Sequence, residues 1–200
     1  MALVLQKKKN KMIFVTLEGI DNCGKTTLSK KLCKELSSQG KKVHCTRELI
    51  TTDVGDIVLD SFRKGIKLSP QLKALYFAAD RQIRYEEIIK QDYDVVIWDR
   101  YVYSSLVYRE MESCNVAWVD EINKIFKVPE LNIYMDVSLK TAMSRARENK
   151  RILPYTKKEL GLCRGIYLRY VKENRLLQYQ GYEWLLNEIN KQIGRVNERD

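Results

Sequence analysis

The sequence has no cysteine pair at metal-binding spacing, no long apolar run and no surplus of acidic residues. Its five cysteines, at positions 23, 33, 45, 114 and 163, lie too far apart for C-x₂-C metal pairs, which argues against a structural zinc site. Their odd number is expected where thiols stay reduced. No apolar stretch approaches the roughly 20 residues of a membrane span, and the first ten residues lack the apolar core of a signal peptide. We therefore expect an intracellular, cytoplasmic protein without a membrane partner.

The charge balance is basic, with 36 Lys and Arg residues against 26 Asp and Glu and a net charge of +10. Such a surplus favours polyanionic partners, and nucleotides and nucleic acids both qualify. The run KKKNK at residues 7–11 is either a small nucleic-acid-binding arm or, as its terminal place favours, a solvated end of the chain. We predict a flexible basic segment over residues 1–11. A chain of 200 residues without repeats or linkers suits one domain, residues 1–200, which buries about 70% of its unfolded surface.

Short apolar runs alternate with helical patterns along the chain, which is the rhythm of a parallel sheet covered by helices. We predict an α/β fold, a three-layer sandwich with a five-stranded parallel sheet. The predicted strands are Ile13–Leu17, Val43–Thr46, Val95–Trp98, Ile133–Val137 and, more weakly, Trp184–Leu186. In such sheets ligands bind beyond the carboxyl ends of the strands, so the residues that follow each run are the candidates for function.

A phosphate-binding loop follows the first strand. Residues 19–26 (GIDNCGKT) match G-x-x-x-x-G-K-[ST], and leucines at helical spacing come next. Backbone N–H groups and the positive end of a helix dipole would then point at one spot. The alternative, a glycine turn before an ordinary helix, is disfavoured by this strand-loop-helix context. Lys25 is expected at the β- and γ-phosphates and Thr26 at Mg²⁺. The predicted ATP-binding residues are Gly19, Asn22, Cys23, Gly24, Lys25, Thr26 and Thr27.

Charged residues also follow the third and second strands. Asp99 ends the third strand, where an acidic side chain would complete the Mg²⁺ shell together with Thr26. The plainer alternative is a surface ion pair between Asp99 and Arg100. Arg100 can neutralise a phosphate through its planar fork of donors, and Arg47, after the second strand, could hold the phosphate of an acceptor.

A long helix is predicted after Ser69-Pro70, because serine caps helices and proline suits the first helical position. Phe77 and Arg81 lie four residues apart, hence on one face of it. Such a pair can stack on a base and donate to its carbonyl oxygen, although an aromatic residue at helical spacing is more often part of the core.

A basic segment follows the fourth strand and contains Arg145, Arg147, Lys150 and Arg151. It would serve as a mobile lid over residues 147–157 that closes over the phosphates and brings an arginine to the transition state. A solvated helix face is the alternative for each single residue.

Taken together, these segments resemble the thymidylate kinase family, P-loop enzymes that move the γ-phosphate of ATP onto dTMP. The resemblance rests on residues 17–27, 46–48, 75–81, 99–108 and 129–137, with 99–108 (DRYVYSSLVY) the most specific stretch. It implies a P-loop NTPase sheet with strand order 2-3-1-4-5, ATP and Mg²⁺ as donor and cofactor, dTMP as acceptor in dTTP synthesis, and a homodimer.

The resemblance also implies a role for single residues. The acceptor-binding set would be Asp21 at the sugar, Arg47 and Arg100 at the phosphate, Phe77 on thymine, Arg81 at a base oxygen, Ser104 and Ser105 at the base edge, and Tyr108 against the deoxyribose. The catalytic cations would be Lys25, Arg100, Arg145, Arg147 and Arg151.

Several positions depart from the family pattern. Asn22 stands where some members carry arginine, which shifts charge stabilisation to the lid. Leu49 replaces a proline beside the acceptor phosphate, and Arg109 stands where many members have glutamine, which puts base selectivity in doubt. The adenine contacts of ATP stay unassigned.

Two other functions stay open. The first is a P-loop kinase for another acceptor, such as dUMP or a deoxynucleoside. The second is a P-loop switch or nucleic-acid-associated ATPase, but residues 123–126 (NKIF) lack the aspartate of a guanine-reading N-K-x-D motif. The basic residues are also spread along the chain, so nucleic acid is not the expected partner.

Overall fold

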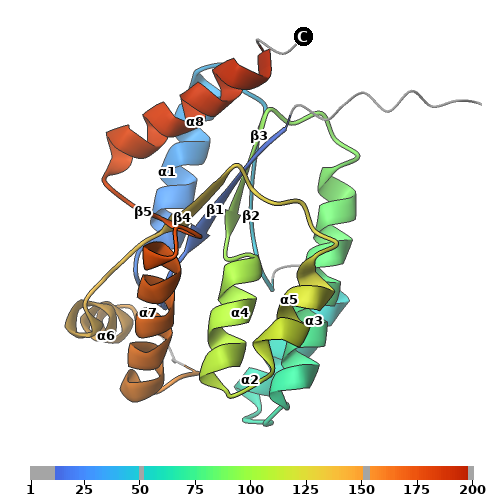
Figure 1. Ribbon diagram of the computed structural model, residues 1–200, viewed down its shortest axis with the longest axis vertical. Coiled ribbons are helices and arrows are strands. Elements are labelled where there is room, and N and C mark those ends of the chain that lie inside the picture. The colour runs from blue at the N-terminus through green and yellow to red at the C-terminus, as the bar shows by residue number, and fades with distance from the viewer. Residues whose placement is uncertain (1–11, 50–51, 151–153, 198–200) are drawn as a thin grey trace, which may run out of the picture.

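Five parallel strands form one sheet in the order β2-β3-β1-β4-β5 (Figure 1). The computed structural model describes residues 12–49, 52–150 and 154–197, so the expected flexible segment 1–11 lies outside the described residues. The strands are β1 (Ile13–Glu18), β2 (Val43–Arg47), β3 (Val95–Asp99), β4 (Leu131–Tyr134) and β5 (Leu177–Gln178). Every neighbouring pair is parallel. The predicted fold class and strand order are confirmed.

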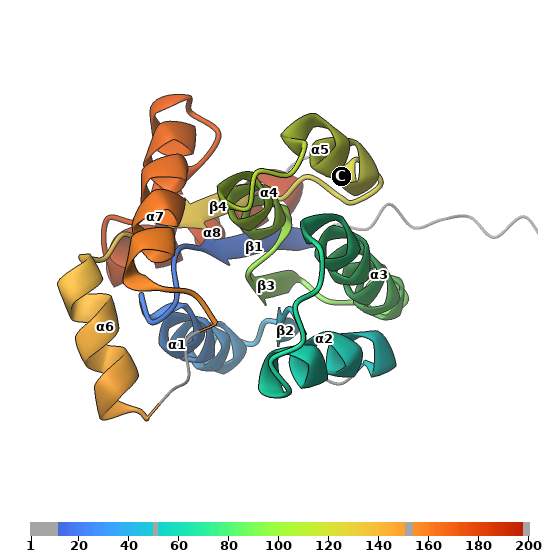
Figure 2. The ribbon, with the colours of Figure 1, turned by 90° about the horizontal axis from the view of Figure 1, so that it is seen from below.

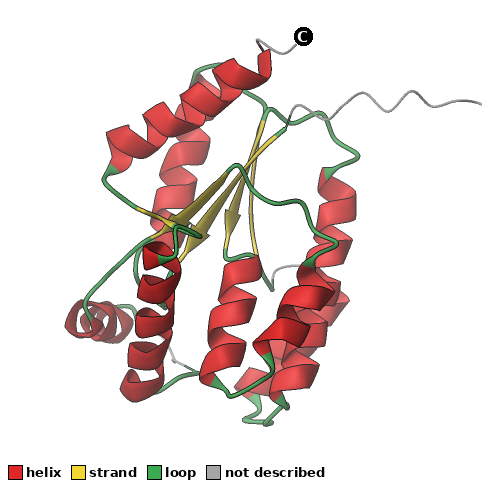
Figure 3. Ribbon diagram, in the orientation of Figure 1, coloured by secondary structure: helices red, strands yellow, loops and turns green. Residues whose placement is uncertain are grey.

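Helices cover both faces of this sheet, as Figures 2 and 3 show. They are α1 (Lys25–Ser38), α2 (Asp53–Arg63), α3 (Pro70–Ile88), α4 (Val102–Met111), α5 (Val116–Asn123), α6 (Leu139–Glu148), α7 (Lys157–Lys172) and α8 (Tyr182–Asn197). Helix α1 lies on one side of the sheet and α3, α4 and α5 lie on the other. None of the helices within the described part of the chain is long and apolar enough to cross a membrane.

The side chains of the central strands alternate between the two layers, because successive residues of a strand point to opposite faces. Ile13, Val15 and Leu17 belong to a cluster that includes the buried leucines of α1. Phe14 and Trp98 of β3, whose ring centres lie 6.3 Å apart, belong to a second cluster with Ile88 of α3 and Phe126. Both faces of β1 and β3 are therefore buried, which explains why their sequences are nearly continuous in apolar residues.

The fifth strand is not where the sequence predicted it. Trp184–Leu186 lies in α8, and the strand consists of Leu177–Gln178. Leu185, Ile189 and Ile193 are buried at intervals of four, which is the period of a helix packed on one side. The two residues of β5 are both exposed, so this short edge strand carries no apolar signal. The fourth strand also ends earlier than predicted, at Tyr134.

Local signals at the helix ends act as expected. Ser69 caps α3 by accepting a hydrogen bond from the Leu72 N–H at 3.1 Å, and Pro70 is the first residue of the helix. Thr156 and Glu159 form a reciprocal capping box that starts α7. These caps define the entry points of two helices whose residues reach the site.

Candidate active site

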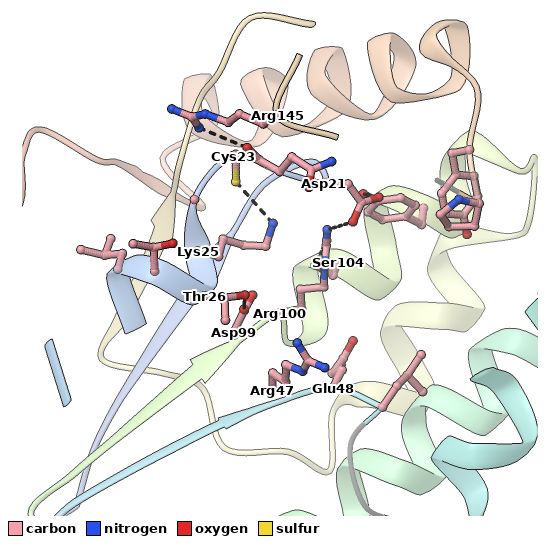
Figure 4. Close-up of a pocket in the computed structure, with 18 of the residues that line it drawn as sticks. Asp21, Cys23, Lys25, Thr26, Arg47, Glu48, Asp99, Arg100, Ser104 and Arg145 are labelled. Atoms are coloured by element: carbon pink, nitrogen blue, oxygen red, sulfur yellow. Dashed lines mark hydrogen bonds and ion pairs between the residues drawn. The ribbon is translucent and has the colours of Figure 1, made fainter. Parts of the chain in front are cut away.

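The predicted site residues gather at the carboxyl ends of β1, β2 and β3, around a cavity of about 1000 Å³ (Figure 4). Those that line it are Asp21, Asn22, Cys23, Gly24, Lys25, Thr26, Thr27, Arg47, Phe77, Asp99, Arg100, Ser104, Ser105, Tyr108 and Arg145. Gly19, Arg81 and Arg147 do not line it, and Arg151 lies outside the described residues. The sheet therefore brings together groups that stand as far apart as residues 21 and 145.

The loop between β1 and α1 depends on two glycines. Gly19 has φ +144°, and a Cβ atom there would lie 2.7 Å from the backbone oxygen of Met135 and 2.8 Å from the Cys23 sulfur. Gly24 precedes α1 with φ +108°, another conformation that side chains rarely adopt. These turns let the loop fold tightly before the helix, with the first N–H groups of α1 left without partners in the helix itself.

Lys25 and Thr26 begin α1 and point into the cavity (Figure 4). The ammonium of Lys25 donates to the backbone oxygens of Gly19 and Ile20 at 2.9 and 2.8 Å. The Thr26 hydroxyl donates a hydrogen bond at 2.6 Å to the carboxylate of Asp99, which is the last residue of β3. Asp99 is bound by this threonine and forms no ion pair with Arg100 in the structure, in contrast to the plainer alternative from the sequence.

Arg100 is directed to the loop by an unusual backbone. Its φ is +69°, rare for a residue with a side chain. Its guanidinium donates to Gly19 O at 3.0 Å and to the Asp21 carboxylate at 2.8 Å. Burial works to raise the pKa of Asp21, but the positive charges of Arg100 and Lys25 outweigh it and lower that pKa. Asp21 is thus an anion that holds the guanidinium in place.

Glu18 supports the site from outside the cavity wall, and sequence reasoning missed this role. Its carboxylate is fully buried and accepts hydrogen bonds from the Tyr101 N–H at 2.9 Å, the Ser104 hydroxyl at 2.5 Å and the Tyr167 hydroxyl at 3.2 Å. Burial raises its pKa, while these donors and the nearby cations act against the rise. The available signal was an acidic residue that closes an otherwise apolar strand. Through these contacts Glu18 fixes the backbone at Tyr101, the residue that follows Arg100.

Comparison with known proteins decides the family. A family model described as thymidylate kinase matches residues 17–199. The chain belongs to the thymidylate kinase family. It is 30% identical over 194 residues to the probable thymidylate kinase of Caldivirga maquilingensis, with 94% of each chain covered. It is 34% identical over 173 residues to that of Metallosphaera sedula, with 86% of this chain and 82% of the relative covered.

Two solved thymidylate kinase structures have a similar fold. The crystal structure from Ehrlichia chaffeensis gives a TM-score of 0.66 at 24% identity and covers 89% of this chain and 98% of its own. The structure from Candida albicans gives 0.71 at 17% identity, with 94% and 93% covered. The resemblance to thymidylate kinases inferred from the sequence is confirmed.

In this member of the family, Arg81 does not occupy the expected place. Its side chain is fully buried and pairs with the Glu48 carboxylate, which is itself buried. It also donates to Asn123 and, at 2.8 Å, to the Ser105 hydroxyl. A carboxylate in apolar surroundings requires a cation, and Arg81 supplies it. Burial nevertheless raises the pKa of Glu48 to about 7. The structure therefore gives no cavity contact to Arg81, contrary to the expectation that it reaches a base oxygen.

Arg109 is the guanidinium that does line the cavity beside Phe77. It lies 5.7 Å from the centre of the Phe77 ring and is only 1% exposed. It forms an ion pair with Glu112 at 2.8 Å and donates to the Tyr155 hydroxyl at 3.3 Å. The sequence singled out Arg109 only as a departure from the family pattern.

The basic segment after β4 is divided between cavity and solvent. Arg145 of α6 donates to the Asn22 backbone oxygen at 3.1 Å and lines the cavity. Arg147 is exposed and points elsewhere, since two residues along a helix amount to a rotation of about 200°. Pro154 and Tyr155, at the end of the expected lid, also line the cavity.

Three further residues of the cavity wall were not foreseen. Lys31 of α1, Tyr179 and Tyr182 line the cavity, and the Lys31 ammonium lies 3.4 Å from the centre of the Tyr182 ring. They add aromatic surface and positive charge to the cavity wall. No sequence motif marked these residues.

Proposed function

We propose that the protein transfers the γ-phosphoryl group of ATP to dTMP, producing ADP and dTDP for dTTP synthesis. One observation carries the proposal: Lys25 and Arg100 both donate to the same atom, the backbone oxygen of Gly19, at 2.9 and 3.0 Å. One cation belongs to the phosphate loop and the other to the opposite wall of the cavity. A phosphoryl group that passes between two phosphates needs positive charge on both sides of its path, and these two cations meet there.

The phosphate loop would hold ATP. Gly19, Asn22, Cys23, Gly24 and Thr27 would present the loop backbone and the start of α1 to its phosphates, with Lys25 as the cation at the β- and γ-positions. The aromatic surface of Tyr179 and Tyr182 is our candidate for the adenine end.

Mg²⁺ fits the oxygens of Thr26 and Asp99. These two oxygens lie 2.6 Å apart at the edge of the phosphate loop, and Mg²⁺ usually takes one or two protein oxygens together with phosphate oxygens and water. No group of three or more His, Cys, Asp or Glu side chains that could hold a metal ion occurs among the residues that the structure describes. When bound, the ion would neutralise charge on the phosphate oxygens.

The opposite wall would hold dTMP. Arg47 and Arg100 would bind its phosphate, Asp21 and Tyr108 would lie at the sugar, and Phe77 would stack on thymine. The hydroxyls of Ser104 and Ser105 already bond Glu18 and Arg81, so we propose that they position the base edge of the site. The acceptor phosphate oxygen is already ionised, so no general base is required.

Residues 147–157 would act as the lid that excludes water, because water competes with dTMP as acceptor. Arg145 supports this proposal, since its contact with Asn22 already brings a cation from α6 to the phosphate loop. We keep Arg147 and Arg151 as candidate cations that would require the lid to move.

Steady-state assays of ADP formation test the function, with dTMP, dUMP, dCMP, dGMP, thymidine and single-stranded DNA offered separately. We expect turnover with dTMP well above all others except dUMP. Absence of turnover with dTMP would refute the proposal, turnover with thymidine would favour a deoxynucleoside kinase, and stimulation by DNA would favour an ATPase. Lys25→Met should lower kcat by at least about 1000-fold with an unchanged melting temperature, since it removes the phosphate-loop cation.

We further propose a cytoplasmic homodimer. Apolar side chains exposed on α2 and α3 support it, among them Ile57, Leu72 and Leu75, which are 38 to 49% exposed. Light scattering on the purified chain measures the mass directly, and a monomer at assay concentration would refute the dimer.

A further inference from the structure

Two arginines lie near Phe77, and only one of them faces the cavity. Arg81 is enclosed by Glu48, Asn123 and Ser105 and is absent from the cavity wall. Arg109 lines the cavity, with its guanidinium 5.7 Å from the centre of the Phe77 ring. A flat base stacked on Phe77 would therefore meet Arg109 first.

The orientation of Arg109 is fixed by its neighbours. Glu112 pairs with its Nε at 2.8 Å and also accepts from Lys73 at 2.5 Å. On the other side the Tyr155 hydroxyl lies 3.3 Å from a terminal nitrogen of Arg109. A buried guanidinium held at two points presents its remaining N–H groups in a constant direction.

We propose that Arg109 determines the base specificity of the acceptor site and selects pyrimidines with a 4-oxo group over those with a 4-amino group. The inference rests on the proposed function, because it assumes that the acceptor base stacks on Phe77. Guanidinium has donors and no acceptor. The 4-oxo group of thymine or uracil accepts its hydrogen bond, whereas the 4-amino group of cytosine is another donor and would leave both buried donors without a partner.

Glutamine at this position would behave differently. Its amide carries both a donor and an acceptor and can turn to suit either base. Arginine therefore enforces a choice that glutamine would relax. Discrimination by a buried polar group left unpaired amounts to about 10- to 100-fold in kcat/KM.

The test compares dUMP with dCMP, with dTMP as reference, in the wild-type enzyme and in Arg109→Gln and Arg109→Lys. We expect the wild-type ratio of kcat/KM for dUMP over dCMP to fall at least about tenfold in Arg109→Gln. The KM for ATP should stay within about twofold. Arg109→Lys keeps the charge and donors without the planar fork, so we expect it to retain most of the preference with a higher KM for dUMP. Arg195→Gln, an exposed arginine on α8, is the matched control.

The outcomes separate the two proposals. An unchanged ratio in a folded Arg109→Gln enzyme that still phosphorylates dTMP would overturn the role of Arg109 and leave the kinase function standing. Wild-type enzyme without turnover on dTMP would overturn the function and this inference with it. If Arg109→Gln does not fold, Arg109→Lys carries the test. Loss of the preference for dUMP over dCMP in Arg109→Lys, with the KM for ATP not raised, would overturn the proposal that donors at this place select the base.

Discussion

Glu18 offers the sharpest test of how the fold prepares the site. It is a buried carboxylate behind the phosphate loop, and its three donors come from Tyr101, Ser104 and Tyr167. We predict that Glu18→Ala destabilises the protein and also weakens catalysis, although Glu18 does not line the cavity. Glu18→Gln should do both to a smaller degree.

The magnitude follows from the contacts. Glu18→Ala removes three hydrogen bonds of about 1 kcal/mol net each and leaves the Tyr101 N–H buried without its acceptor, which costs a further 1–3 kcal/mol, roughly. Removal of a carboxylate whose burial is itself unfavourable offsets part of this loss. We expect the free energy of unfolding to fall by about 3 kcal/mol. In Glu18→Gln the amide oxygen still accepts from Tyr101 and the hydroxyls can rotate to accept from the amide nitrogen, so the loss should be about 1 kcal/mol.

The catalytic effect acts through Arg100. Its backbone, at φ +69°, is held by its own N–H bond to Leu17 O at 3.0 Å and by the bond from the next N–H to Glu18. Without the second bond the guanidinium no longer has a fixed direction toward Gly19 O. We expect kcat/KM for dTMP to fall about 10- to 100-fold in Glu18→Ala, because a small displacement of a positioning group has this effect.

Urea unfolding followed by circular dichroism measures the first effect, and the ADP assay with dTMP at saturating ATP measures the second. Glu188→Ala is the control. This partly exposed acidic residue of α8 forms an ion pair with the exposed Lys191, which should be worth less than about 0.5 kcal/mol. The reasoning is refuted if Glu18→Ala unfolds at the same urea concentration as the wild type, or if it is destabilised but retains full kcat/KM for dTMP.

Two further predictions concern the loop and the buried pair. Gly19→Ala should cost about 2 kcal/mol of stability and most of the activity, because its Cβ would lie 2.7 Å from Met135 O, whereas Gly165→Ala in α7 meets no atom within 4 Å and should be neutral or slightly stabilising in thermal melts. Burial raises the pKa of Glu48 to about 7, from an unfolded value near 4.5. Between pH 4.5 and 7 the native state therefore binds more protons than the unfolded state, so the free energy of unfolding should fall by up to about 3 kcal/mol as pH rises through this range. Glu48→Gln should remove this slope in urea titrations at several pH values, and an equal slope in both proteins would contradict the assignment.

Local patterns were enough to predict the framework of the fold. Strands β1 and β3 are buried on both faces, so their sequences are apolar throughout and easily recognised. The phosphate loop is a local motif, with glycines at fixed spacing between a strand and a helix. Asp99 lies at the tip of β3 and contacts Thr26. This contact was predictable because β3 is the parallel neighbour of β1, and β1 leads into the loop that precedes Thr26.

The partners of buried charged groups could not be predicted in the same way. Phe77 and Arg81 are four residues apart on α3, and helical spacing placed them on one face, yet only Phe77 lines the cavity. The direction of Arg81 depends on Glu48, which lies 33 positions away in the chain. Likewise β5 is a two-residue exposed edge strand whose only mark is its pairing with β4.

The sequence alone determined that the chain forms a parallel α/β sheet with a phosphate-loop motif at residues 19–26 after its first strand, because apolar periodicity and turn geometry are properties of neighbouring residues. The tertiary structure alone decided which charges meet. It paired Glu18 with the backbone that positions Arg100, enclosed Arg81 with Glu48, and left Arg109 in the cavity wall. A buried charge takes the partner that burial brings within reach, and that partner is selected by packing across the whole domain and not by position along the chain.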